Sequence, residues 1–533
     1  MKAYQKVLIG FSAAILSGGM LYLSSPPLDY SYLIWISLVP LFIALIFTGL
    51  IAGILLSILT GIVAGAFLCI WLLEIPNMLF LSYFAIVFYY AVFIGFFGAC
   101  FNIISKRTPR LRVIAAPCIW VAIEYMRSNL SFLALPWTLI GHSQHQNIAI
   151  IQIASFTSVY GVSFLIVFVN AVMAEVVLWL FSRRIRATAQ QPSLSVIIYS
   201  LTVTVIIFGT IYLWGRHQVT LYESNTSDLM TISLIQGNIP QNQKWDSAFR
   251  HTIMERYREL TMQAAEEQPD MIIWPETATP GKIGADRWVD MSVKSLIEET
   301  RLPLLLGSTS HGKLEMGGRK IRREKNSAFL LDANAEVIDT YHKIRLVPFG
   351  EYLPLEGKFR WPKWLVPDHG DTLPGTEYTV FRFPKGNFGV VICWENLFPD
   401  LFRRFVRNGA EFMVNLTNEA HFGKTAAPYQ MMAMSVFRAV ENRVSLLRCA
   451  NTGITAVVDP LGRVKGKVMD EAGNDIFVAG ILTTSVPASW GMTFYTRYGD
   501  VFAIFCVLGG LLCVLIAVIN PRYRTSFKKS LRL

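Results

Sequence analysis

The stretch Gly389-Val390-Val391-Ile392-Cys393-Trp394-Glu395-Asn396 carries the signal that decides the fold. Its uncharged, mostly β-branched first half is typical of a buried strand, and the residues from 396 to 405 have the apolar spacing of an amphipathic helix. At such a strand-to-helix turn, a helix N-terminus can lower the pKa of the Cys393 thiol and backbone N–H groups can face an oxyanion. The stretch alone leaves two interpretations open: a catalytic nucleophile, or a small buried hydrophobic side chain.

The composition indicates an integral membrane protein. Among 533 residues, 53% are hydrophobic, and the mean hydropathy is +0.42, which is too apolar for an ordinary soluble chain. The net charge of +11 is compatible with nucleic-acid binding, but the basic residues gather at the edges of apolar runs, as in membrane proteins. Of the seven cysteines, only Cys393 and Cys449 lie in the polar part of the chain, so a disulfide framework is excluded. No cysteine–histidine spacing indicates a metal site.

Eight apolar runs predict eight membrane spans, which divide the chain into domains. Residues 1–215 are predicted to hold seven transmembrane helices, residues 228–488 a globular domain, residues 498–520 an eighth helix and residues 521–533 a basic tail. The predicted runs are 7–23, 32–50, 51–73, 79–104, 113–126, 159–181, 195–214 and 501–519. The run 113–126 is short for a hydrocarbon core about 30 Å thick.

Basic segments predict the orientation of these spans. With eight spans, the loops 106–112 and 183–186 and the tail fall on the same side as the N-terminus. The positive-inside rule makes this side the cytoplasm, so both termini are expected there and the globular domain is expected on the extracytoplasmic side. Glu124 and Arg127 are spaced to pair on one helix face, and a structural or interfacial role is favoured over a functional one.

The region 228–488 alternates short apolar strands with helical patterns, which predicts an α/β domain. Three of its strands end in polar motifs. Glu276 follows the strand-like run 271–274, Lys343 lies in the run 341–354, and Cys393 ends the strand described above. A thiolate nucleophile, a carboxylate base and an ammonium that stabilises an oxyanion together suit acyl transfer. For Glu276 and Lys343 taken singly, a solvated position is the other interpretation.

These three motifs, in this chain order, resemble the Glu–Lys–Cys triad of the nitrilase, or carbon–nitrogen hydrolase, superfamily. The resemblance implies an α/β/β/α sandwich with the cysteine at a strand-to-helix elbow, attached here to a polytopic α-helical membrane domain. It also implies that Cys393 is the nucleophile, Glu276 the general base and Lys343 the oxyanion stabiliser. Glu351 would orient Lys343 or share its proton.

Further segments resemble the apolipoprotein N-acyltransferase family over nearly the whole chain. They are the runs 135–161, 236–246, 348–354 and 415–423. The resemblance adds the supporting or substrate-site residues Trp394, Glu395, Asn238, Trp245, Asn415 and Glu419. The chain departs from the family pattern in three places: Trp394 replaces a tyrosine, Glu419 an aspartate and His421 a tryptophan.

The resemblance implies a ping-pong reaction without a metal or a diffusible cofactor. A membrane phospholipid would acylate Cys393, and the α-amine of the diacylglyceryl-modified N-terminal cysteine of an apolipoprotein would then accept the acyl chain. The run 359–367 combines aromatic, aliphatic and basic residues, and it is either a lid at the lipid interface, with Phe359, Trp361 and Trp364, or a loop packed on its own domain. The alternatives are a membrane-tethered amidase that acts on a small amide, and a transporter or scaffold with an inert globular domain.

Overall fold

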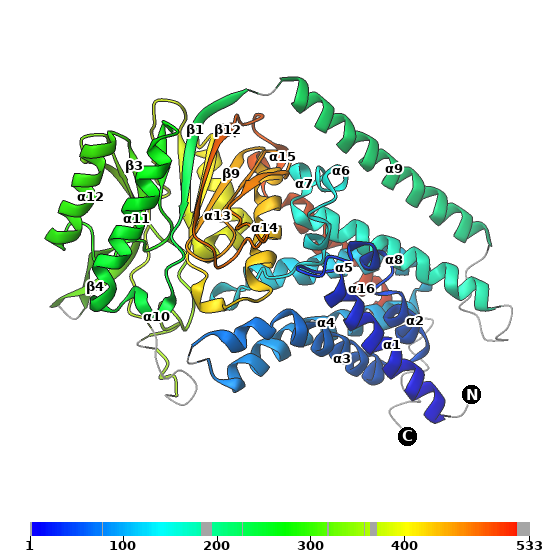
Figure 1. Ribbon diagram of the computed structural model, residues 1–533. Helices are drawn as coiled ribbons and strands as arrows, with labels where there is room; N and C mark the ends of the chain where they lie inside the picture. The colour runs from blue at the N-terminus through cyan, green and yellow to red at the C-terminus, as the bar shows by residue number, and fades with distance from the viewer. Residues whose placement is uncertain are drawn as a thin grey trace. The chain divides into compact units, whose positions relative to one another are not determined.

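The computed structural model describes residues 3–76, 78–182, 194–225, 227–316, 319–356, 358–362 and 370–519. The chain forms two compact units, whose elements are labelled in Figure 1. One unit comprises Met1–Leu73, Met78–Gln218 and Asp500–Leu533, and the other comprises Glu74–Asn77 and Val219–Gly499. The loop 183–186 and the tail, which were used to predict the orientation, lie outside the described residues.

The first unit is helical. Within the described residues, five helices are long and apolar enough to cross a membrane. They match five of the predicted runs: α3 (Leu50–Leu68), α4 (Phe80–Arg107), α8 (Val159–Ser182), α9 (Leu194–Asn225) and α16 (Val501–Ile519). The other three runs form α1 (Ala3–Leu23), α2 (Val39–Phe47) and α5 (Arg112–Asn129). Helix α2 is shorter than its predicted run 32–50, because Pro40 stands in its first turn and a 3₁₀ turn at Ser31–Trp35 precedes it. A polytopic helical unit is confirmed, and the count of eight spans stays a prediction.

Small residues and buried polar groups organise this unit. Helices α3 and α4 approach closely at Gly61, where an added Cβ would lie 2.5 Å from Ala91 Cα. Among the described residues, Glu124 and Arg127 form no ion pair with one another, contrary to the predicted pairing. Glu124 Oε1 instead accepts hydrogen bonds from Trp120 Nε1 and from the backbone N–H of Ile140, at 3.0 and 2.8 Å, and Arg127 donates to the carbonyl of Trp137 at 2.9 Å. Both side chains therefore hold the segment that follows α5.

The described part of the second unit forms two six-stranded mixed sheets. The first has the order β12-β1-β2-β3-β4-β5, with β1 (Asp228–Gln236), β2 (Met271–Ile273), β3 (Leu304–Met316), β4 (Arg319–Leu331), β5 (Val337–His342) and β12 (Gly480–Pro487). The second has the order β11-β10-β9-β8-β7-β6, with β6 (Val380–Phe381), β7 (Phe388–Ile392), β8 (Phe412–Thr417), β9 (Ser445–Ala450), β10 (Ala456–Val458) and β11 (Val464–Lys467). In each sheet three neighbouring strands are parallel, β1-β2-β3 and β7-β8-β9.

The sheets pack face to face between two layers of helices, as Figure 1 shows. Helices α11 (Arg250–Ala265) and α12 (Arg287–Thr300) bury their apolar faces against β2, β3 and β4. Helices α13 (Pro399–Arg407) and α14 (Ala427–Asn442) pack on β7 and β9. Between the sheets, the thiol of Cys449 on β9 lies 3.4 Å from the carbonyls of Ile235 and Ile273 on β1 and β2. The predicted α/β/β/α sandwich is confirmed, and Cys393 and Cys449 are both free thiols.

Candidate active site

The elbow at Cys393 begins where the fully buried strand β7 ends. Gly389 on β7 lies so close to its neighbours that an added Cβ would be 2.7 Å from Met413 Sδ. Cys393 itself has φ +56°, a left-handed conformation that is strained for a residue with a side chain. A 3₁₀ turn at Cys393–Leu397 comes next, so α13 starts at Pro399, three residues later than the sequence predicts. The turn presents Cys393, a residue that is only 7% exposed.

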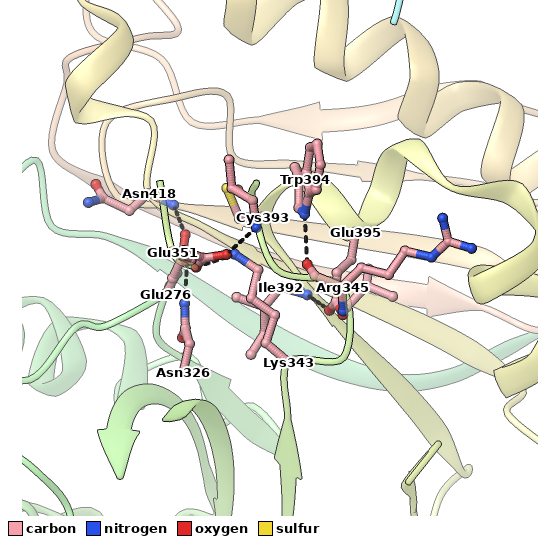
Figure 2. A network of polar contacts seen from close by, with 12 residues as sticks. Glu276, Asn326, Lys343, Arg345, Glu351, Ile392, Cys393, Trp394, Glu395 and Asn418 are labelled. Atoms are coloured by element: carbon pink, nitrogen blue, oxygen red, sulfur yellow. Dashed lines mark hydrogen bonds and ion pairs between the residues drawn. The ribbon is translucent and has the colours of Figure 1, made fainter. Parts of the chain in front are cut away.

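The carboxylate of Glu276 is fixed between the two sheets. Glu276 follows β2, and its backbone passes Gly307 of β3, where an added Cβ would lie 2.7 Å from Glu276 Cα. Its Oε1 accepts a hydrogen bond from Asn326 Nδ2 of β4, and its Oε2 accepts one from the backbone N–H of Asn418, just beyond β8, both at 2.7 Å (Figure 2). One donor comes from each sheet, so the carboxylate is held in a single orientation.

Lys343 follows β5 and is only 1% exposed. Its Nζ lies 2.7 Å from Glu351 Oε1 and 3.9 Å from Glu276 Oε1. The other oxygen of Glu351 accepts a hydrogen bond from the backbone N–H of Val347 at 2.7 Å. Burial acts to lower the pKa of Lys343, but Glu351, Cys393 and Glu276 outweigh it and the net pKa is raised. The ammonium therefore stays charged beside the thiol.

Burial raises the pKa of the Cys393 thiol, and Glu276 raises it further, while Lys343 opposes the shift. This corrects the expectation of a pKa lowered at the elbow, because the thiol is desolvated inside the sandwich and α13 begins only at Pro399. The resting thiol is protonated and needs a base to become a nucleophile. Figure 2 shows Cys393, Glu276, Lys343 and Glu351 gathered at the junction of the two sheets, so the structure brings all four predicted residues together.

Glu395 joins the elbow to the segment that follows Lys343. One of its oxygens accepts hydrogen bonds from the backbone N–H groups of Ile344 and Arg345, and the other accepts one from that of Ile392, at 2.7–2.8 Å. The hydroxyl of Tyr341 donates to the same carboxylate at 2.9 Å. Burial raises the pKa of Glu395 to about 7, against the effect of the backbone donors.

Trp394, Asn415 and Glu419 surround the same elbow. Trp394 Nε1 donates to the carbonyl of Arg345 at 2.7 Å. Asn415 Nδ2 donates to the carbonyl of Cys393 at 3.3 Å and accepts from the guanidinium of Arg448 at 2.8 Å through Oδ1. Arg448 also pairs with Glu419, and all three side chains are buried. Asn415 therefore holds the backbone of Cys393, and the ion pair of Arg448 with Glu419 supports Asn415.

Asn238 and Trp245 lie in the segment that follows β1. Asn238 donates from its backbone N–H to the carbonyl of Asn451 at 2.9 Å and from Nδ2 to the carbonyl of Phe477 at 3.1 Å. Trp245 is 58% exposed. Its neighbour Lys244 is the residue that reaches the site, through a hydrogen bond of 3.0 Å from Nζ to the carbonyl of Glu276.

The predicted lid is described only in part. Phe359 is 51% exposed, and its ring lies 4.8 Å from that of Trp361. Trp361 also contacts the ring of Phe349 at 4.9 Å and donates from Nε1 to the carbonyl of Pro354 at 2.6 Å, so it packs on its own loop. Trp364 lies outside the described residues.

Sequence reasoning missed Asn326, Asn418, Lys244 and Arg448 as site residues. Asn326 carries no local signal, because it is one polar residue in a strand that pairs with others far away in sequence. Asn418 contributes its backbone N–H, which depends on the course of the chain after β8. Lys244 stands in the quoted run 236–246, so a signal was present, but its burial is visible only in the fold.

Comparisons with known proteins identify the class of this chain. Residues 231–488 match the carbon–nitrogen hydrolase family, so the sandwich belongs to that class of enzyme domain. Residues 17–172 match the apolipoprotein N-acyltransferase N-terminal domain. The apolipoprotein N-acyltransferase of Geobacter metallireducens is 37% identical over 76% of this chain and 74% of its own length, and that of Chlorobaculum tepidum is 29% identical over 95% and 96%. The chain belongs to the apolipoprotein N-acyltransferase family.

Solved structures of an amidase from Nesterenkonia sp. are also similar. One of them is 17% identical and covers 52% of this chain and 93% of its own, with a TM-score of 0.35.

Proposed function

We propose that this chain transfers an acyl group from a membrane phospholipid to the α-amino group of a diacylglyceryl-modified N-terminal cysteine of an apolipoprotein. The lipoprotein acceptor follows from the names of the relatives, and the phospholipid donor from the family resemblance and the apolar helices. The observation that carries the proposal is the placement of Lys343 Nζ, 3.9 Å from Glu276 Oε1, beside a buried thiol at the Cys393 elbow.

In the first half-reaction, Glu276 takes the proton of the Cys393 thiol, and the thiolate attacks the ester carbonyl of the phospholipid. Lys343 neutralises the resulting oxyanion. When the tetrahedral intermediate collapses, the carbon–oxygen bond of the ester breaks and Glu276 gives its proton to the leaving alkoxide. The products are a thioester on Cys393 and a lysophospholipid.

In the second half-reaction, the α-amine of the acceptor attacks the thioester carbonyl and again produces an oxyanion beside Lys343. Glu276 removes a proton from the amine as the amide forms. The carbon–sulfur bond then breaks, and the thiolate of Cys393 recovers its proton from Glu276. Proton and charge return to the starting state, so the cycle needs no added acid, base, metal or redox partner.

The site has the environment that a waiting thioester needs. Cys393, Lys343 and Glu276 are buried, which limits attack by water before the amine arrives. The exposed ring of Phe359 and the adjacent Trp361 are proposed as the lipid-facing part of a lid. The positive-inside rule, applied to the basic loops and tail, supports an extracytoplasmic position for the globular unit and a cytoplasmic position for both termini.

Mass spectrometry of the full chain in detergent tests the proposal. After incubation with phospholipid, the wild-type protein should gain the mass of one fatty acyl chain on Cys393, and a diacylglyceryl-cysteine peptide should then remove it. Cys393→Ala should gain no mass, Glu276→Gln should gain it at least about 100-fold more slowly, and the exposed control Glu298→Gln should match the wild type. A wild-type protein that never forms the adduct but hydrolyses small amides would favour the amidase instead.

A further inference from the structure

Lys244 is a buried cation that the mechanism above does not use. It ends the short helix α10 (Gln241–Lys244), and its side chain is 4% exposed. Its Nζ donates a hydrogen bond of 3.0 Å to the main-chain carbonyl of Glu276. A buried ammonium beside the general base changes the electrostatic potential at the point where the reaction moves charge.

Asn418 bonds both Glu276 and helix α10. Asn418 donates from its backbone N–H to Glu276 Oε2 and from Nδ2 to Gln241 Oε1, at 2.7 and 3.1 Å. Asn451 Nδ2 in turn donates to Asn418 Oδ1 at 2.9 Å and fixes that side chain. The position of Lys244 relative to Glu276 is therefore built into the fold.

Lys244 and Lys343 differ in their partners. Lys343 is ion-paired with Glu351, whereas Lys244 forms no direct ion pair within the described ranges. The groups that favour its charged form are Glu276 and Cys393, two of the proposed reacting residues. His421, on the turn Ala420–Phe422, faces both lysines; burial and then the charges of Lys244 and Lys343 lower its pKa to about 4, so the imidazole is neutral near pH 7.

We propose that Lys244 is a second cation of the catalytic site, which stabilises the negative charge as it passes from Glu276 to the Cys393 sulfur and then to the oxyanion. This inference rests on the proposed function and deepens it. Lys343 carries one positive charge beside two carboxylates, Glu351 and Glu276, so one negative charge is left over, first on Glu276 and then on the thiolate, and a second cation is needed to offset it in the buried site. Lys244 supplies that charge without entering an ion pair that would hold it elsewhere.

Lys244 and Lys343 lose their positive charges at different pH values. Burial lowers the pKa of Lys244 to about 8, although Glu276 and Cys393 act against the shift. The pKa of Lys343 is raised instead, so Lys343 keeps its charge where Lys244 loses it. As the pH rises through about 8, the site loses one positive charge, and thioester formation should lose the corresponding stabilisation.

The test is the initial rate of thioester formation on Cys393 by the full chain in detergent, measured between about pH 6 and about pH 10. The wild-type rate should fall on the alkaline side of a midpoint near pH 8. Lys244→Met should be about 10- to 100-fold slower below that midpoint and should lack the alkaline fall. Lys244→Arg should keep most of the rate and move the fall upward. The exposed control Lys294→Met should match the wild type.

Alkylation of Cys393 by iodoacetamide, assigned by peptide mass, gives a readout that does not need acyl transfer. Lys244→Met should need a higher pH than the wild type for the same alkylation rate. If the wild type never forms a thioester but this difference is found, the proposed function fails and the role of Lys244 stands. Equal alkylation profiles and equal pH–rate profiles for wild type and Lys244→Met would overturn the inference. If Lys244→Met does not fold, coincident alkaline limbs for wild type and Lys244→Arg would overturn it.

Discussion

The ammonium of Lys343 lies closer to Glu351 Oε1, at 2.7 Å, than to Glu276 Oε1, at 3.9 Å. Glu351 thus holds Lys343 in place, while Glu276 stays available to exchange protons. The two carboxylates have different hydrogen-bond donors, which fits two different roles. Glu276 is bound by neutral amide groups, and Glu351 is bound by the ammonium and by a backbone N–H.

Replacing Glu351 with glutamine should therefore leave Lys343 in the chain but remove the carboxylate that holds its ammonium in place. The pKa of Lys343 should fall because its strongest charged partner is lost, and thioester formation should slow by about 100-fold. The rate is measured by intact-protein mass spectrometry. Glu356→Gln is a matched control, since Glu356 is exposed and pairs with Arg323. An undiminished rate in Glu351→Gln would mean that Lys343 is positioned by other groups.

Glu395 should make stability depend on pH. Its folded-state pKa of about 7 lies above its ordinary value of 4.5, so the folded chain holds a proton that the unfolded chain releases between these values. Its contribution to stability is therefore complete below about pH 4.5 and is lost as the pH rises to about 7, by roughly 3 kcal/mol in total. Thermal unfolding of wild type and Glu395→Gln in detergent measures this. The variant should lack this pH dependence, and an identical dependence in both proteins would contradict the assignment.

Breaking the buried pair of Arg448 and Glu419 should destabilise the sandwich strongly. Arg448→Met leaves a buried carboxylate without its partner, which costs about 3–5 kcal/mol. Arg448→Met combined with Glu419→Gln should recover part of the loss, because the uncompensated charge is gone. Thermal unfolding of the three proteins gives the comparison. A double variant less stable than Arg448→Met would show that the charge is not the cause.

The lid proposal predicts a selective loss with lipid donors. Phe359→Ala should slow acylation from phospholipid vesicles. It should change the free energy of unfolding by no more than about 0.5 kcal/mol, as is usual for surface substitutions. Replacing Trp361 and Trp364 with alanine should also reduce transfer. Phe359 is half exposed while Trp361 packs on its own loop, so Phe359→Ala is the cleaner test. Unchanged transfer in both variants would favour the interpretation of 359–367 as an ordinary surface loop.

Local sequence was sufficient to predict those site residues that lie directly at the end of a strand. Cys393 and Glu276 follow buried apolar strands and Lys343 follows the half-exposed strand β5, and the fold brings the three residues together. The span 501–519 was also predictable, because a continuous apolar run needs no partner to be recognised. The lowered pKa expected for Cys393 was wrong, since desolvation depends on what the rest of the chain packs around the thiol.

Long-range partners could not be predicted from local patterns. Asn326 meets Glu276 across 50 residues, and Arg448 meets Asn415 across 33 residues. A buried arginine on β9 looks, in sequence, like a charged residue that interrupts an apolar strand. The packing of β8 beside β9 shows what this arginine does. Its guanidinium bonds Asn415, and Asn415 in turn donates to the carbonyl of Cys393.

Glu276 and Lys343 follow strands of one sheet, and Cys393 follows a strand of the other. During synthesis, Glu276 and Lys343 emerge from the ribosome before Cys393, and β8 and β9 emerge after all three. A partly made chain therefore has no complete site, and its thiol stays without its base until both sheets have closed on one another. The proposed site is therefore complete only once the strands of both sheets have been made and have packed against one another.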